Sequence, residues 1–338
     1  MPRNIALLGG QSSGKSTLLG ALGNALKAET LTHLRMDGLD ADARGLQRLA
    51  QPLHHGRYPQ RTKAGERIDL VVPLRTTGDY FGSDAFTLRA GDYDGEEVDR
   101  LFRDRLREWT SEWRQRALAD GLLLLLRPGE KTRPPRLQSS PLPDDMARWR
   151  LLRERGASSA SPSEQASVPH RSDSFFGQIY LEEAPPPPHA TPTDPVAIPV
   201  ELPLIELLQF IRNVRELPAG RRPRKDHERF RIALLVTAWD AVSQDWRKAG
   251  PAAFLSHHFP LLDDYLWSNF LPDDVFRFGL SATGGDLRDP DYSQAYLDMD
   301  DPAGFVEWLD PLLGIRNSRD IGMPLYWVLF GDRALGAL

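Results

Sequence analysis

The chain has 338 residues, of which 41% are hydrophobic and 26% charged, a composition typical of a globular protein with one large core or two smaller ones. Its formal net charge of −5 gives no reason to expect direct binding of nucleic acid, which selects an excess of Lys and Arg. The absence of cysteine excludes disulfides, thiolate metal sites and cysteine nucleophiles, and it agrees with a reducing compartment.

Apolar runs predict the strands of the protein in chain order. They lie at residues 4–8, 68–74, 85–90, 121–126, 231–237 and 275–280. The longest uninterrupted run, 121–126, is far shorter than the roughly 20 residues that a membrane-spanning helix needs. We therefore expect a cytoplasmic protein without a membrane partner.

Helical spacing of apolar residues appears between most of these runs. The predicted helices are 14–27, 96–117, 251–270 and 302–312. Strands that alternate with helices indicate an α/β fold, in which a mostly parallel sheet carries helices on both faces.

Residues 128–199 differ in composition from the rest of the chain, because they are rich in Pro, Ser and Ala. Such a segment buries little apolar surface, so we expect a flexible insertion between the fourth and fifth predicted strands. The expected organisation is a first part of one domain at 1–127, the insertion at 128–199 and a second part at 200–338.

A glycine-rich stretch follows the first strand directly. Residues 9–17 read GGQSSGKST and match G-x-x-x-x-G-K-[ST] between a predicted strand and a predicted helix, which is the context that a phosphate-binding loop requires. Lys15 is expected to reach the β- and γ-phosphates, and the Ser16 hydroxyl is expected to bind Mg²⁺. The residues expected at the nucleotide are Gly10, Gln11, Ser12, Ser13, Gly14, Lys15, Ser16 and Thr17.

Two further features are expected near the γ-phosphate. Asp92 to Gly95 reads DYDG after the third strand and resembles the D-x-x-G loop of GTPases. The resemblance implies that Asp92 would hold Mg²⁺ through water and that Gly95 would donate its N–H to the γ-phosphate. The plainer alternative is that this Asp-Gly pair only marks a turn. Thr62 lies between the first helix and the second strand, where a first-switch threonine that binds Mg²⁺ is expected.

The fifth strand ends in Thr237-Ala238-Trp239-Asp240, which resembles the [N/T]-K-x-D motif of the translation-factor-related (TRAFAC) class of P-loop GTPases. The resemblance implies that Asp240 accepts hydrogen bonds from N1 and N2 of guanine, donors that adenine lacks. Ala238 stands where the motif has lysine, so Trp239 is the alternative residue for stacking on the base. Asp240 as a helix N-cap is the structural alternative.

The sixth strand ends in Ser281-Ala282-Thr283, which is similar to the S-A-x motif of the same GTPases. In that motif backbone N–H groups close the guanine pocket, so Ser281 and Ala282 join Thr237 and Asp240 as expected base-site residues.

The amino-acid sequence of the expected phosphate loop resembles that of dynamin-related GTPases. This resemblance implies that Gln11 and Ser12 help to position the attacking water. Lys15 and Thr62 are the other residues expected to take part in catalysis. Glu96 stands where Ras-like GTPases carry their water-orienting Gln, which favours a mechanism based on Gln11. Nothing in the chain resembles the stalk or membrane-binding part of dynamins.

The long insertion and the compact arrangement of motifs are similar to the double-GTPase domains of bacterial conflict systems. That resemblance implies a switch that acts with other proteins of the same system, for example in defence against phage. From the motifs we expect it to bind GTP or GDP with Mg²⁺ and to hydrolyse GTP slowly. Two alternatives remain open: a nucleotide-dependent scaffold that does not hydrolyse, and an ATP-using enzyme in which Asp240 is only a cap.

Overall fold

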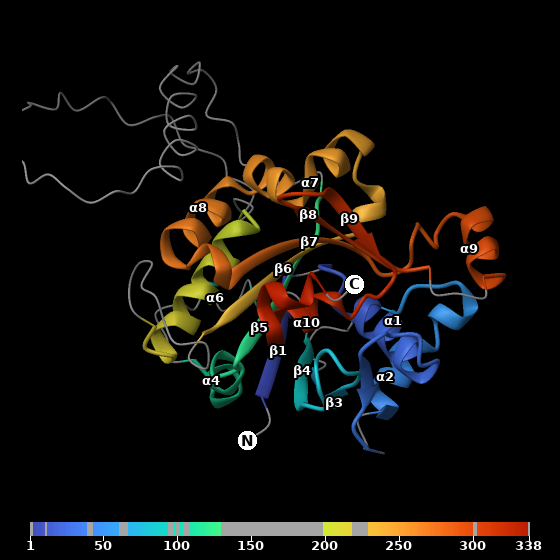
Figure 1. The fold of residues 1–338 in the computed structure, drawn as a ribbon, viewed down its shortest axis with the longest axis horizontal. Helices are drawn as coiled ribbons and strands as arrows, with labels where there is room; N and C mark the ends of the chain where they lie inside the picture. Colours follow the sequence, from blue (N-terminus) through green and yellow to red (C-terminus); the bar gives the residue numbers. More distant parts are fainter. Residues whose placement is uncertain are drawn as a thin grey trace, which may run out of the picture. The chain divides into compact units, whose positions relative to one another are not determined.

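A nine-stranded sheet runs through the part of the chain that the structure describes (Figure 1). Its strands are β1 (Arg3–Gly9), β2 (Leu34–Met36), β3 (Arg67–Thr76), β4 (Ala85–Tyr93), β5 (Gly121–Leu126), β6 (Arg231–Thr237), β7 (Val275–Ser281), β8 (Phe305–Asp310) and β9 (Gly314–Ser318). The computed structural model describes residues 3–10, 12–38, 43–60, 67–93, 98, 102–103, 109–129, 199–217, 229–299 and 303–336. Most of the predicted insertion, 130–198, therefore lies outside the described residues.

The strand order is β2-β3-β4-β1-β5-β6-β7-β8-β9. The central strands β4, β1, β5, β6 and β7 are parallel to one another, whereas β3 and β8 pair antiparallel with both of their neighbours. The predicted α/β class with a mostly parallel sheet is confirmed. Strands β5 and β6 are neighbours although the insertion separates them, so both flanks of the insertion contribute to the same sheet.

Helices cover both faces of this sheet. They are α1 (Lys15–Lys27), α2 (Ala43–Ala50), α4 (Ser111–Ala117), α6 (Glu201–Val214), α7 (Gln244–His258), α8 (Pro260–Asn269), α9 (Pro290–Leu297) and α10 (Met323–Phe330), with short 3₁₀ turns that include η1 (Leu53–His55) and η4 (Trp239–Ala241). No helix among the described residues is long and apolar enough to cross a membrane.

The alternation of side chains along the strands divides the core into two layers. In β1, Ile5 and Leu7 point to the layer that α1, α2 and α10 cover, whereas Ala6 and Leu8 point to the layer that α4, α6, α7 and α8 cover. All six residues of β5 are buried, as expected for a central parallel strand that packs against helices on both faces.

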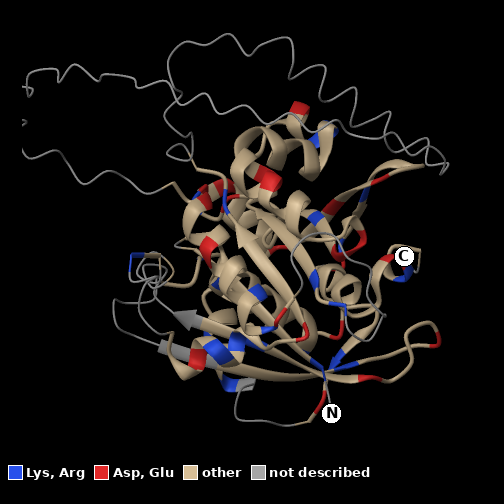
Figure 2. Ribbon diagram, turned by 90° about the vertical axis from the view of Figure 1, so that its left-hand side faces the viewer, with Lys and Arg blue, Asp and Glu red and all other residues tan. Residues whose placement is uncertain are grey.

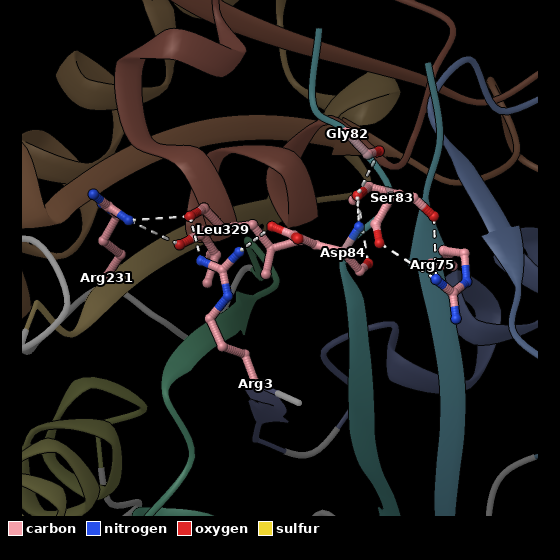
Figure 3. A network of polar contacts seen from close by, with 9 residues as sticks. Arg3, Arg75, Gly82, Ser83, Asp84, Arg231 and Leu329 are labelled. Carbon is pink, nitrogen blue, oxygen red and sulfur yellow. Dashed lines mark hydrogen bonds and ion pairs between the residues drawn. The ribbon is translucent and has the colours of Figure 1, made fainter. Parts of the chain in front are cut away.

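Two arginines at the amino-terminal ends of β1 and β6 hold the last helix against the sheet. Arg3 Nη1 donates to the carbonyl oxygen of Leu329 at 2.7 Å, and Arg231 Nη1 lies 3.3 Å from the same oxygen (Figure 3). Positive charge at the carboxyl end of a helix is favourable because the last carbonyl groups point toward it. Helix α10, which is almost wholly buried, is fixed at this end.

The helix predicted at 302–312 is wrong. Residues Phe305–Asp310 form strand β8, which pairs with β7 on one side and with β9 on the other. The run contains Phe, Val and Trp, which favour strands, and the sequence that follows returns as a hairpin partner. Asp310 closes the turn by accepting the N–H groups of Leu312 and Leu313 at 2.8 and 2.9 Å.

The other predicted helices are confirmed in part. The helix predicted at 14–27 is α1. The one predicted at 251–270 is two helices, α7 and α8, which meet at Phe259. Within the range 96–117 the structure has α4, and much of the rest lies outside the described residues. In the ribbon of Figure 2 acidic and basic residues are interspersed along the helices and loops.

Candidate functional site

The phosphate-loop sequence turns sharply from β1 into α1. Gly14, at the N-cap of α1, has φ of +86°, a left-handed conformation that glycine adopts without strain. Gly9 is needed for a different reason, because a Cβ at this position would lie 2.6 Å from Ser13 Oγ and 2.8 Å from the carbonyl oxygen of Leu125. The loop therefore curls back on itself at the carboxyl end of the central strand.

The Lys15 side chain lies over this loop and is buried, with 6% of its surface exposed. Its Nζ donates to the carbonyl oxygens of Gly9 and Gly10, both at 2.9 Å, and lies 3.4 Å from Ser13 Oγ. The first turn of α1 contains no acidic residue, and the first N–H groups of a helix have no acceptor inside the helix. The ammonium group and the helix terminus thus create a place suited to an anion.

Thr237, at the end of β6, holds the loop in this shape. Its Oγ1 lies 2.9 Å from the carbonyl oxygen of Ser13 and 3.3 Å from that of Leu126, and the side chain is 5% exposed. The expected base motif and the expected phosphate loop are therefore in direct contact.

Trp239 is part of the core rather than of the site. Its side chain is fully buried, and its indole N–H donates to Glu307 Oε2 at 2.6 Å. The ring packs on Gly279 of β7 so closely that a Cβ there would lie 2.3 Å from it. These contacts contradict the alternative that Trp239 stacks on a base in place of the missing lysine. Glu307 also pairs with Arg247 of α7.

Asp240 is half-buried and faces the end of the neighbouring strand. Its Oδ1 accepts a hydrogen bond from Ser281 Oγ, which in turn accepts the N–H of Gly284 at 2.9 Å. The N-cap alternative is wrong, because the cap positions of η4 and α7 are Ala238 and Ser243. The structure thus brings Asp240 together with the loop that begins at Ser281 and continues through Ala282.

Two tyrosines that the sequence did not single out lie near Asp240. Burial raises the pKa of Tyr58 and of Tyr292, and the negative charge of Asp240 raises both further. Tyr292 OH donates to the carbonyl oxygen of Thr283 at 2.7 Å. No motif marks either residue, because their roles depend on contacts with a distant loop rather than on spacing in the sequence.

Part of the predicted site falls on residues that the structure does not describe. Gln11, Thr62 and Gly95 lie outside the described residues, as does Glu96. The backbone of Asp92 is described: it pairs with Ile68 near the end of β4. Because β4 is parallel to β1, Asp92 lies at the edge of the sheet where β1 runs into the phosphate loop.

The donors expected at Mg²⁺ are oxygen atoms, which is the chemistry that this cation prefers. Ser16 lies in the first turn of α1, partly buried. Among the described residues, no group of three or more His, Cys, Asp or Glu forms a metal site, but Mg²⁺ at a nucleotide needs only one or two protein ligands besides phosphate and water. The residues present fit a nucleotide-bound Mg²⁺ better than a cation held by protein alone.

The chain matches the model of a known protein family. A family model described as Double-GTPase 1 matches residues 6–328. No curated protein matches the chain. The matched range begins in β1 and ends in α10, so it includes the phosphate loop, Thr237, Asp240 and Ser281.

Proposed function

Since the chain belongs to the Double-GTPase 1 family and is a GTPase-type domain, we propose that it is a Mg²⁺-dependent switch that binds GTP and hydrolyses it slowly. The nucleotide lies along the carboxyl ends of β1, β6 and β7, with its phosphates at residues 10–17 and its base at Thr237, Asp240, Ser281 and Ala282. Ligands of parallel sheets bind at this edge, where the loops that follow neighbouring strands converge.

One observation carries this proposal: Thr237 joins the phosphate loop to the base motif. Its hydroxyl contacts the carbonyl oxygen of Ser13, and three residues later Asp240 pairs with Ser281. The Asp240 carboxylate thus follows the end of β6, and the start of α1, which is suited to an anion, lies beside the same strand end. This arrangement matches a ligand that carries phosphates at one end and hydrogen-bond donors at the other. Guanine presents such donors at N1 and N2, and adenine does not.

In the proposed reaction the chain supplies positioning and positive charge. Lys15 and the N–H groups at the start of α1 stabilise negative charge on the β- and γ-phosphates while water attacks in line. Gln11 and Ser12 orient that water, and Gly95 donates its N–H to the γ-phosphate. Ser16 and Thr62, with Asp92 through water, would hold Mg²⁺, which when bound would supply positive charge at the phosphate oxygens.

The rate of this reaction is expected to be low. Switch GTPases without a partner turn over at about 10⁻⁴ to 10⁻² per second, and an arginine supplied by another protein raises this by about 10³ or more. We propose that the chain acts in the cytoplasm with other proteins of a bacterial conflict system and that one of them provides such stimulation.

Calorimetric titration of the purified chain with GTP, GDP and ATP in the presence of Mg²⁺ tests the proposal. We expect guanine nucleotides to bind at least about tenfold more tightly than ATP, a gap of about 1.4 kcal/mol. Lys15→Ala should abolish binding of all three, because it removes the charge that faces the phosphates. Tighter binding of ATP would contradict the assignment of the base site and favour an ATP-using enzyme.

Asp240→Asn tests the base assignment directly. The substitution keeps the size of the side chain and removes the carboxylate, so GTP affinity should fall while ATP affinity stays within about twofold. Phosphate release on the same samples then separates a switch from a scaffold: nucleotide retention without release of phosphate would favour the scaffold.

A further inference from the structure

The hydroxyl of Tyr58 lies within the loop that follows Ser281-Ala282-Thr283. It is 3.3 Å from the carbonyl oxygen of Gly285 and 3.3 Å from Asp286 Oδ1, and it accepts the N–H of Leu287 at 3.2 Å. A phenol has one proton and can accept at the same oxygen, so this single group engages three consecutive residues of the loop. Burial raises the pKa of Tyr58, so the hydroxyl remains a donor at neutral pH.

Helix α9 holds the same loop from another direction. The ring of Tyr292 packs against Gly285, where a Cβ would lie 2.5 Å from the ring. Ser293 Oγ donates to the carbonyl oxygen of Gly56 at 2.9 Å, and Gly56 has φ of +62°. The segment that carries Tyr58 is therefore fixed on α9 two residues before the tyrosine.

A short chain of bonds leads from Tyr58 to Asp240. Gly285, which Tyr58 contacts, follows Gly284, and the N–H of Gly284 is bonded to Ser281 Oγ. Ser281 Oγ is also the donor to Asp240. Through these bonds, a shift of the loop at Gly285 would change the orientation of the Asp240 carboxylate.

We propose that Tyr58 is a positioning residue for base recognition. It connects the loop beside Asp240 to the segment of the chain that leads into the expected first switch. The inference rests on the proposed function, since it assumes a guanine at Asp240. Tyr58 precedes Thr62 by four residues. Its hydroxyl keeps the loop 283–287 closed, and through Ser281 it keeps Asp240 in the orientation that favours guanine over adenine.

The test is Tyr58→Phe in the full chain, with two readouts. The first is the dissociation rate of a fluorescent GDP analogue, and the second is the ratio of ATP to GTP dissociation constants. Loss of one neutral hydrogen-bonding group should speed GDP dissociation about three- to tenfold and lower the guanine preference by a similar factor. ATP affinity should stay within about twofold. Tyr80→Phe is the control, because Tyr80 is 47% exposed and lies between β3 and β4.

A purely structural role for Tyr58 would weaken all nucleotides alike and lower the melting temperature, leaving the guanine preference unchanged; that result would overturn the inference. Wild-type dissociation and preference in Tyr58→Phe would also overturn it, while the proposed function stood. Failure of the wild-type chain to prefer guanine would instead refute the proposed function and this inference with it. Combining Tyr58→Phe with Ser281→Ala adds a second measurement: if both act through the same bonds, the double variant should lose little more guanine preference than Ser281→Ala alone.

Discussion

Thr237 Oγ1 donates a hydrogen bond to the carbonyl oxygen of Ser13 across 2.9 Å. The two residues are 224 positions apart in the chain, yet this bond fixes the middle of the phosphate loop to the end of β6. Gly14 lies beside the same side chain, since a Cβ on it would be in ordinary van der Waals contact with Thr237 at 3.5 Å. The shape of the phosphate loop thus depends on the strand that leads to Asp240.

Thr237→Val tests this dependence. The variant keeps the volume of the side chain but leaves a buried carbonyl oxygen without its donor, so the free energy of unfolding should fall by about 1–2 kcal/mol. Nucleotide affinity should fall as well, because the loop is less well ordered before binding. Chemical denaturation and calorimetry measure the two effects. Thr237→Ser retains the hydroxyl and should lose much less of both; equal losses in the two variants would contradict the role of the bond.

Gly9 and Gly10 offer a matched pair of substitutions. A Cβ at Gly9 would meet Ser13 Oγ and the backbone of Leu125, whereas nothing lies within 4 Å of the corresponding position on Gly10. Gly9→Ala should therefore cost about 1–3 kcal/mol of stability through overpacking. Gly10→Ala should change stability by less than about 0.5 kcal/mol, because alanine reduces the conformational entropy of the unfolded chain and this gain offsets any small strain in the folded loop. Similar melting temperatures for the two variants would show that the loop is not packed as described.

The sequence predicts much of this fold because the relevant signals are local. The short apolar run Gly121–Leu126 favours a buried strand by its length, and the leucines of α1 recur at helical spacing directly after the glycine-rich loop. The same holds for the glycine-rich loop, whose residue types predict the sharp turn from β1 into α1 that the structure has.

Local signals fail at Phe305–Asp310, where the apolar spacing resembles a helix. The strand is fixed by distant partners: Glu307 lies opposite Gly279 of β7 and accepts the indole N–H of Trp239. A buried carboxylate would be unfavourable without its donors, and these, Trp239 and Arg247, are 68 and 60 positions away in the chain. No sequence pattern within 302–312 predicts these distant contacts.

The contacts around Asp240 were predicted only in part for the same reason. Asp240 and Ser281 follow from the order of motifs, but the contacts of Tyr58 with Gly285 span 227 positions. Trp239 illustrates the opposite error. An aromatic residue beside a motif suggests stacking on the ligand, whereas the absence of a side chain at Gly279 lets the indole enter the core.

Glu307→Ala tests whether the Trp239 contact supports the base motif. The substitution leaves the indole N–H buried without an acceptor and removes the partner of Arg247, so stability should fall by about 2–4 kcal/mol. Glu307→Gln keeps an acceptor for the indole and should cost less. GTP affinity of the folded Ala variant should also fall, because Asp240 follows Trp239 directly. Unchanged GTP affinity would mean that Asp240 is held by Ser281 alone.

Glu201 provides a test of stability against pH. The residue is 1% exposed at the start of α6, and its Oε2 accepts the N–H of Leu262 at 2.8 Å. Burial raises the pKa of its carboxyl group above the usual 4.5, an effect that hydrogen bonds from Leu262 and Leu261 reduce. The folded protein thus holds this proton more tightly than the unfolded chain does. The resulting contribution to stability is fully present below about pH 4.5 and is lost as the pH rises through the folded value.

Glu201→Gln should consequently stabilise the protein at pH 7, where the wild type holds a buried carboxylate, and the difference in melting temperature should shrink toward zero as the pH falls to about 4. Gln resembles the protonated carboxyl group and can still accept the N–H of Leu262, so the two proteins become alike in acid. Melting curves of both proteins at matched pH values measure this difference directly. Glu216→Gln, at an exposed position just after α6, reports the effect of losing one negative charge without burial. A gain that is equal at pH 4 and pH 7 would point to improved packing at residue 201 and would exclude proton uptake by Glu201 as the cause.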